Sequence, residues 1–216
     1  MTRAKRKLRP GLVIAFVLFA GATGFAVGPY FLLDPSLGRV DLDPAFPMHF
    51  PLLLVHIFAS FLALAVGWLQ FLPALRRSRP GLHRLVGRLY LICIAVGGGT
   101  AIVVGAYTDS FIRQMAFLVL VALWFYTTGR GYAAIRRKQH AAHGLWMLRS
   151  YAVTLVAATA RIVTPFCIAI YAATHGGLPP GGVRSVVSLM LDFNIWLALL
   201  INLLAVEWVI AKRLLR

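Results

Sequence analysis

Long, uninterrupted apolar segments constrain this chain more than any other feature of its sequence. About 20 consecutive apolar residues are enough for a helix to cross the hydrocarbon core of a bilayer. Only 13% of the residues are charged and 60% are hydrophobic, whereas a soluble domain carries about 25% charged residues. The sequence therefore predicts an all-α integral membrane protein, a single helical bundle with six transmembrane helices. We expect these helices near residues 11–33, 48–74, 85–107, 114–134, 148–172 and 186–210.

The basic residues predict the orientation of these helices. Lys and Arg number 22 against 6 Asp and Glu, a formal net charge of +16. They lie in short runs between apolar segments, which indicates membrane topology and not nucleic-acid binding. Because Lys and Arg favour cytoplasmic loops, we expect both termini in the cytoplasm and anionic lipid headgroups as partners. Eighteen fall on one predicted side: Arg3, Lys5, Arg6, Lys7, Arg9, Arg76, Arg77, Arg79, Arg84, Arg88, Arg130, Arg136, Arg137, Lys138, Arg149, Lys212, Arg213 and Arg216.

The basic start followed by an apolar segment is also typical of a cleaved signal peptide. The apolar part of a signal peptide is usually about 7–15 residues long and ends at an A-x-A-like site. The segment here is longer and has no clear site of that kind. We therefore interpret residues 11–33 as the first membrane helix.

A short internal repeat relates two of the predicted hairpins. Arg76-Arg77, followed after five residues by His83, reappears sixty residues later as Arg136-Arg137 and His143. Each copy follows a helix that runs inward and precedes one that runs outward. The second and third helices would then be related to the fourth and fifth by an axis along the membrane normal, as in parallel transporter repeats. His83 and His143 become symmetry mates at the cytoplasmic surface.

Three polar side chains lie at membrane depth in the outer half of the bilayer. They are His56, Arg161 and Asp192, placed by a rise of about 1.5 Å per residue from the helix ends. An unpaired charge at such a depth costs at least about 2.5 kcal/mol. We therefore expect Arg161 and Asp192 to face the bundle interior and to pair, with His56 beside them. The cluster is either a structural ion pair or a polar pocket for a small ligand, a quinone headgroup or a proton path.

The cytoplasmic side collects a second set of candidate ligands. Neutral imidazoles are common ligands of haem iron and of zinc. The repeat makes His83 and His143 the natural axial pair of a b-type haem, with His140 or Met147, each one turn from His143, as substitutes. His83, His140, His143 and Glu207 together also have the composition of a zinc site. A third interpretation is that these histidines only contact lipid headgroups.

Four functions remain open at this point, and whether the protein is an enzyme is undecided. The first is a haem-binding protein in membrane electron transfer, with a quinone or redox partner at the His56, Arg161 and Asp192 cluster. The second is a small-molecule transporter or channel that uses the same cluster, for which six helices suggest a homodimer. The others are a zinc-dependent membrane hydrolase with Glu207 as ligand or base, and an assembly subunit without chemistry.

Two segments resemble a known family. Residues 82–90, LHRLVGRLY, and 142–151, AHGLWMLRSY, are similar to the bacterial predicted membrane proteins grouped as domain of unknown function 2306, and residues 52–56 and 69–73 fit the same pattern. The likeness covers about residues 50–165, with the first and last helices weakly matched. It implies a multi-pass protein of the bacterial inner membrane and supplies no activity.

One departure from the family pattern is visible in the second copy of the repeat. Gly144 stands where the first copy has Arg84 and where the family often has His-Arg. This weakens the inference that both loops perform the same task. The stretch from Leu82 to Gly87, with the pattern L-H-R-x-x-G, is also similar to one in haem-carrying ferric-reductase-like membrane domains. That looser likeness motivates the haem hypothesis.

Overall fold

The computed structural model describes residues 21, 23–25, 27–37 and 42–215 of the 216-residue chain. Within these ranges all regular secondary structure is helical, and no strand occurs. The helix predicted at 11–33 lies largely outside the described residues, as do the amino-terminal basic residues on which the placement of that terminus rests. Of this segment the structure describes the 3-10 turn η1 at Gly28–Leu32, which is followed by η2 at Pro35–Leu37.

Five described helices are long and apolar enough to cross a membrane: His49–Phe71, Pro80–Ala106, Phe111–Arg136, Val156–Thr174 and Asn194–Leu214. The first comprises α2 (His49–Gly67) and the 3-10 turn η3 (Trp68–Phe71), and the others are α4, α5, α7 and α9. Shorter helices join them: α3 (Pro73–Ser78), α6 (His140–Thr154) and α8 (Gly182–Leu191). The predicted all-helical membrane class is confirmed, and the number of spans among the described residues is five.

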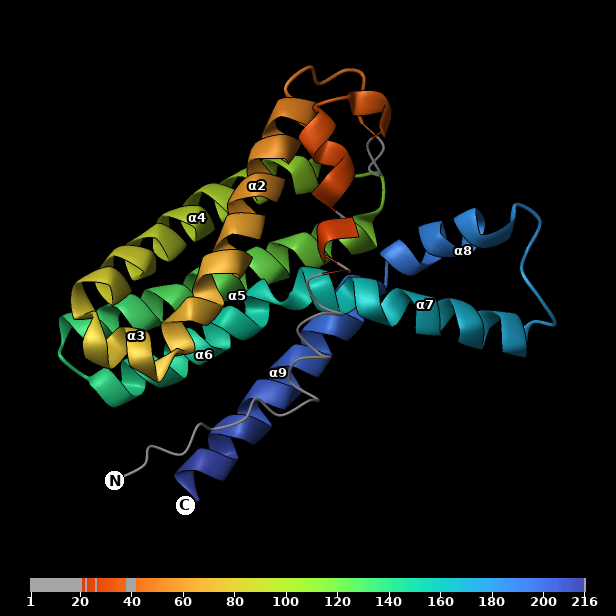
Figure 1. Cartoon of the computed structure of the whole chain (residues 1–216). Coiled ribbons are helices and arrows are strands. Elements are labelled where there is room, and N and C mark those ends of the chain that lie inside the picture. Colours follow the sequence, from red (N-terminus) through yellow and green to blue (C-terminus); the bar gives the residue numbers. More distant parts are fainter. Residues whose placement is uncertain (1–20, 22, 26, 38–41, 216) are drawn as a thin grey trace.

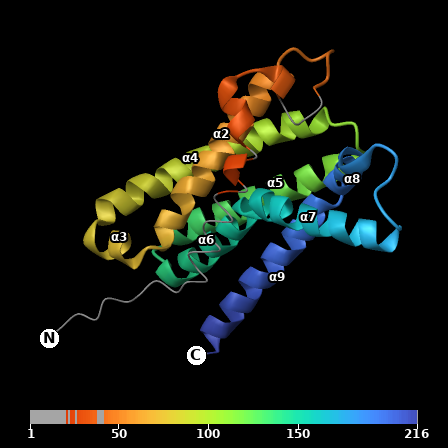
Figure 2. The ribbon, with the colours of Figure 1, turned by 45° about the vertical axis from the view of Figure 1, so that its right-hand side comes forward.

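Two helical hairpins form the body of the molecule. The first packs α2 against α4, the second packs α5 against α6, and α4 joins them by packing on α5. In both views, α3 and the connection between α5 and α6 lie at the same end of the bundle (Figure 1, Figure 2). This is the end that carries the two Arg-Arg pairs, and we call it the basic end. The carboxyl-terminal half of α9 runs toward the same side.

The helices begin and end where local signals place them. Pro80 occupies the first turn of α4, where its missing N–H costs nothing. This helix therefore starts five residues earlier than the apolar run suggests. Ser110 caps α5 by accepting a hydrogen bond from the Arg113 amide at 3.3 Å. Pro73, in the first turn of α3, marks the point where the segment predicted at 48–74 leaves the membrane helix.

Two predicted membrane helices are each divided in the structure. The segment predicted at 148–172 is part of α6 followed by α7, which are separated at Leu155. The chain changes partner at this point, because α6 packs on α5 whereas α7 packs on α9. The segment predicted at 186–210 is interrupted between Leu191 and Asn194, where α8 ends and α9 begins. Mean hydropathy does not detect these breaks, because the residues on both sides are apolar.

The main core lies between the two hairpins. Its buried members are Ala63, Tyr90, Cys93, Ile94, Trp124 and Val153. Small residues let the helix backbones approach each other there. A Cβ added to Gly98 of α4 would lie 2.6 Å from the Phe125 ring of α5, so a side chain at that crossing would have to displace the ring. The outward-facing residues of α4, α5, α7 and α9 are mostly apolar and exposed, as expected for helices that face lipid.

Candidate functional site at the basic end of the bundle

Two histidines occupy equivalent places at the basic end. His83 lies in the first turn of α4 and His143 in the first turn of α6. Both helices run away from the basic end (Figure 1), and the two rings are close enough for their charges to interact. The structure thus brings together the pair that the repeat selects. Their role as ligands stays a prediction.

A hydrogen bond orients the His143 ring. Its Nδ1 donates to the carbonyl oxygen of Gly131 in α5, at 2.8 Å. A carbonyl oxygen only accepts, so the proton is on Nδ1 and Nε2 of the neutral ring keeps its lone pair. Histidines that ligate metals usually donate their other ring N–H to a carbonyl or carboxylate in this way. His143 is therefore prepared to act as a ligand through Nε2.

His83 has a different environment, in which polar atoms lack partners. Its Nδ1 is buried and makes no hydrogen bond with the described residues. The amide nitrogen of Gln70, in η3, is also buried and makes no hydrogen bond within the described part of the chain. The Gln70 side chain contacts Gly87, with Oε1 3.4 Å from the position of an added Cβ, and Gly87 is one turn beyond His83. The inner end of α4 therefore holds two buried polar groups that are available to bond.

The other residues expected at this end do not join the two histidines in a metal-binding group. Glu207 of α9 accepts hydrogen bonds from Arg149 at 2.5 and 2.8 Å. His140, the first residue of α6, is exposed, and Met147 packs against Gly131. Among the residues that the structure describes, no three His, Cys, Asp or Glu side chains gather where they could hold a metal ion. This geometry gives the zinc alternative no support.

A buried network of hydroxyl groups lies deeper between the hairpins. Tyr90 of α4, only 1% exposed, bonds Ser150 Oγ at 2.9 Å and Thr154 Oγ1 at 2.8 Å, both in α6. Thr128 bonds Ser150 at 2.7 Å, and the Trp124 indole donates to Thr154 at 2.8 Å. A search for charged residues and histidines cannot find this network. The repeat could have found it, because Tyr90 and Ser150 are sixty residues apart.

In the half of the bundle away from the basic end, His56 and Arg161 interact electrostatically. His56 of α2 donates from Nδ1 to the carbonyl of Gly97 in α4, at 2.8 Å. Arg161 of α7 donates to the carbonyl of Ala157 at 2.6 Å. Ser60, one turn beyond His56, has a buried hydroxyl that makes no hydrogen bond with the described residues. Two members of the expected outer cluster are thus neighbours.

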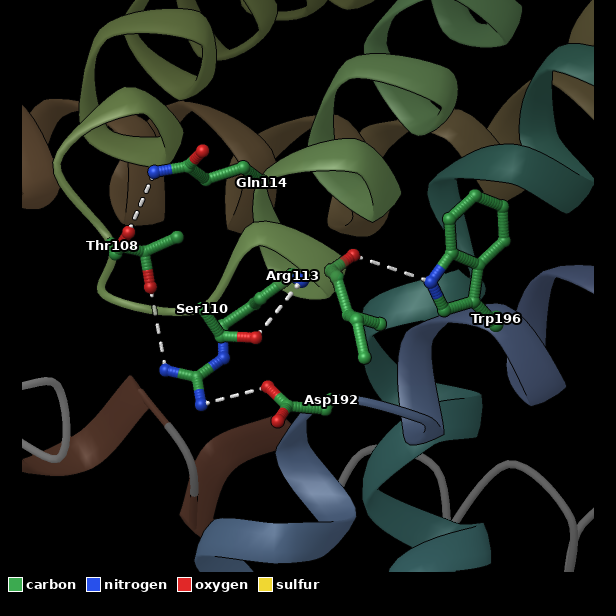
Figure 3. Close-up of polar contacts among 7 residues, drawn as sticks. Thr108, Ser110, Arg113, Gln114, Asp192 and Trp196 are labelled. Atoms are coloured by element: carbon green, nitrogen blue, oxygen red, sulfur yellow. Dashed lines mark hydrogen bonds and ion pairs between the residues drawn. The ribbon is translucent and has the colours of Figure 1, made fainter.

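Asp192, the third expected member, pairs with a different arginine. Its carboxylate accepts a hydrogen bond from Arg113 of α5 at 3.0 Å, and each side chain is 23% exposed (Figure 3). Asp192 lies in the break between α8 and α9, not within a membrane helix. The expected pairing of Asp192 with Arg161 is therefore wrong. The expectation rested on counting residues along one continuous membrane helix at 186–210. Asp192 lies in the break of that helix, so the count does not give its depth.

The surroundings of this ion pair indicate a structural role. Arg113 also donates to Thr108 Oγ1 at 3.3 Å, and Gln114 donates to the Thr108 carbonyl at 2.8 Å (Figure 3). Trp196 of α9 donates to the Ile112 carbonyl at 3.3 Å. These contacts join the outer end of α5 to the junction of α8 and α9.

Comparison with known proteins gives one result. The family described as predicted membrane protein (DUF2306) matches residues 53–210. The chain belongs to the DUF2306 family. No curated protein and no solved structure matches it.

Membership in DUF2306 confirms the resemblance found in the sequence. The match begins in α2 and extends into α9, so it includes both hairpins, His83 and His143. It also covers more than the expected residues 50–165, because α7, α8 and most of α9 belong to it. The shared family region is therefore the whole helical body.

Proposed function

We propose that this DUF2306 protein binds a b-type haem between α4 and α6, with His83 and His143 as axial ligands, and acts in electron transfer within the bacterial inner membrane. The single observation that carries the proposal is the placement of these two histidines at the same end of the bundle. They come from parallel helices, in the first turn of each, and are close enough to interact electrostatically. Two neutral imidazoles from separate helices are the donor set of a six-coordinate b-type haem.

The residues around the pair fit such a group. His143 is held by Gly131 with Nε2 available, and the buried Nδ1 of His83 makes no bond with the described residues. Two glycines flank the pair, Gly81 and Gly144, and nothing lies within 4 Å of a Cβ added to either. The backbone beside both ligands is therefore open to a flat macrocycle. Apolar residues of the core beyond it would exclude water.

A bound haem would supply one-electron chemistry, while the protein sets ligation, burial and local charge. The Gly131 carbonyl would raise the basicity of His143, as such outer partners do. Gln70 packs against Gly87, one turn beyond His83, and its carbonyl Oε1 would accept a hydrogen bond from the protonated Nδ1 of a His83 ring that ligates through Nε2. Arg76, close enough to interact with His83 electrostatically, adds positive charge beside the site. That charge favours anionic groups such as haem propionates.

The repeat supports the same proposal. Tyr90 and Ser150 are in contact with the sixty-residue offset that also separates His83 from His143. We propose that α2 to α4 and α5 to α6 are two copies related by an axis along the membrane normal. The basic end then faces the cytoplasm, as the positive-inside rule requires.

His56 and Arg161 suggest where a quinone that exchanges electrons with the haem would bind. His56 keeps Nε2 available because its Nδ1 donates to Gly97, and Arg161 and the Ser60 hydroxyl lie near it. We propose this group as the contact for a quinone headgroup, whose carbonyl oxygens accept hydrogen bonds and whose reduced forms are anionic. The Arg161 guanidinium would stabilise those anions.

The test is an absorption spectrum of the full chain purified in detergent, first oxidised and then reduced with dithionite. We expect a Soret band and the sharp visible bands of a bis-histidine haem. His83→Ala and His143→Ala should each abolish them, whereas the matched control His140→Ala, which removes an exposed imidazole one turn from His143, should not. A protein without haem, or with bands that survive both substitutions, would contradict the proposal.

A further inference from the structure

An aromatic and basic cluster lies on another face of the second hairpin. The guanidinium groups of Arg130 in α5 and Arg149 in α6 lie 5.0 and 4.9 Å from the centroid of the Trp146 ring. The Tyr126 ring meets Trp146 edge-on at 5.5 Å, and Arg130 is 5.9 Å from the Tyr126 centroid. We call these four residues the Trp146 cluster. Such cation–π contacts hold both guanidinium groups in place.

The two arginines of the cluster differ in charge compensation. Arg149 is neutralised by Glu207 of α9 through two hydrogen bonds. Among the described residues, no carboxylate forms an ion pair with Arg130. Among the described residues Arg130 contacts the faces of two rings, and the N–H groups along the edge of its guanidinium are available. The Trp146 cluster therefore carries one uncompensated positive charge.

The depth of Arg130 makes that charge significant. Arg130 is six residues before the end of α5, which corresponds to about 9 Å along the helix. It is exposed on a helix that is long and apolar enough to cross the membrane. The 26 residues of α5 extend about 39 Å, further than the roughly 30 Å hydrocarbon core, so an arginine this near the end lies at the level of the lipid phosphates. Tyr126, 54% exposed, and Trp146 have the amphipathic rings that favour the headgroup level.

We propose that the Trp146 cluster is a specific binding site for the phosphate of an anionic phospholipid, held by Arg130 against the Trp146 ring. The bilayer supplies this anion at the depth where Arg130 lies. A guanidinium binds phosphate through two parallel N–H donors, and stacking on the ring leaves that edge free. Glu207 neutralises Arg149, so Arg130 supplies the one positive charge of the site and the site binds a single phosphate. The inference does not rest on the haem.

The experiment is native mass spectrometry of the full chain, titrated in detergent with phosphatidylglycerol and, separately, with phosphatidylcholine. We expect preferential retention of phosphatidylglycerol. Arg130→Gln should weaken it about tenfold, which corresponds to about 1.4 kcal/mol, because it removes the charge-assisted hydrogen bonds to the phosphate. Arg130→Lys, which keeps the charge but not the planar fork, should weaken it by a smaller factor. Arg136→Gln is the matched control, because it removes an exposed arginine of the same helix.

Several outcomes would overturn the site. Equal losses in Arg130→Gln and Arg136→Gln would show that retention depends on total charge alone. Equal retention of the two lipids by the unchanged chain would remove the preference for an anion. Loss of a co-purifying protein from Arg130→Gln, with phosphatidylglycerol retained, would assign the surface to a protein partner. Trp146→Leu separates the site from total charge, because it should lower retention without changing the net charge, and unchanged retention in this variant would also contradict the proposal.

Discussion

The hydroxyl groups of Tyr90 and Ser150, sixty residues apart in the chain, share a hydrogen bond of 2.9 Å between α4 and α6. The helices α4 and α6 run in the same direction. Other residues of α4 therefore lie level with the residues of α6 that are also sixty positions later in the chain. His83 and His143 are seven residues, about two turns, before Tyr90 and Ser150. The buried hydroxyl network therefore fixes the register in which the two histidines meet.

The first prediction concerns the stability of that network. Tyr90→Phe removes one hydroxyl and two hydrogen bonds from the core while keeping the ring. We expect a loss of about 1–2 kcal/mol in the free energy of unfolding, because interhelical hydrogen bonds in membranes are modest. Thermal unfolding in detergent measures the change. Tyr132→Phe, at a 48% exposed tyrosine of α5, is the control and should leave the midpoint unchanged.

A second prediction uses two adjacent glycines in α4. A Cβ at Gly98 would lie 2.6 Å from the Phe125 ring, whereas a Cβ at Gly99 would meet nothing within 4 Å. Gly98→Ala should therefore destabilise the protein by about 1 kcal/mol, the low end of the cost of overpacking, because the part-exposed Phe125 ring has to move. Gly99→Ala should be neutral or slightly stabilising, because alanine favours the helix. The same unfolding assay compares them, and equal effects would contradict the predicted crossing of α4 and α5.

A third prediction concerns pH and the loop after η1. The side chain and the backbone amide of Ser36 donate to Asp34 at 2.7 and 2.8 Å, and these bonds hold the pKa of the Asp34 carboxyl below its ordinary value. The contacts are therefore present at neutral pH and are lost as the pH falls through the lowered pKa. Ser36→Ala should raise the pKa of Asp34. Carboxyl carbon NMR titration checks this, and an unchanged midpoint would exclude the Ser36 contacts as the cause.

Sequence patterns predicted the helical membrane class, because the length of an apolar segment identifies a span by a local rule. The pairing of His83 with His143 through a repeat stays a prediction. The breaks at Leu155 and at Asp192 escaped prediction, because they depend on which helix each segment packs against. The hydroxyl network escaped as well, since serine, threonine and tyrosine are common in membrane helices and only their convergence is informative.

The partner of Asp192 illustrates the same limit. Arg113 belongs by sequence to the outer surface, and Arg161 to the membrane, so depth alone favours Arg161. The break before α9 moves Asp192 to the outer end of α5, where Arg113 already bonds Thr108. Depth estimates along a helix fail wherever the helix ends earlier than its apolar run.

The last prediction tests that pair directly. Asp192→Asn should destabilise the protein by about 1–3 kcal/mol, because it leaves a partly buried Arg113 without its counter-charge. The doubly exchanged variant, Arg113→Asp with Asp192→Arg, should recover part of the loss, while each single exchange should be worse than Asp192→Asn. The control is Asp109→Asn, because Asp109 is a nearby acid that forms no ion pair with the described residues. A double-mutant cycle between Arg113 and Asp192 that gives no coupling energy would contradict the junction of α5, α8 and α9 described above.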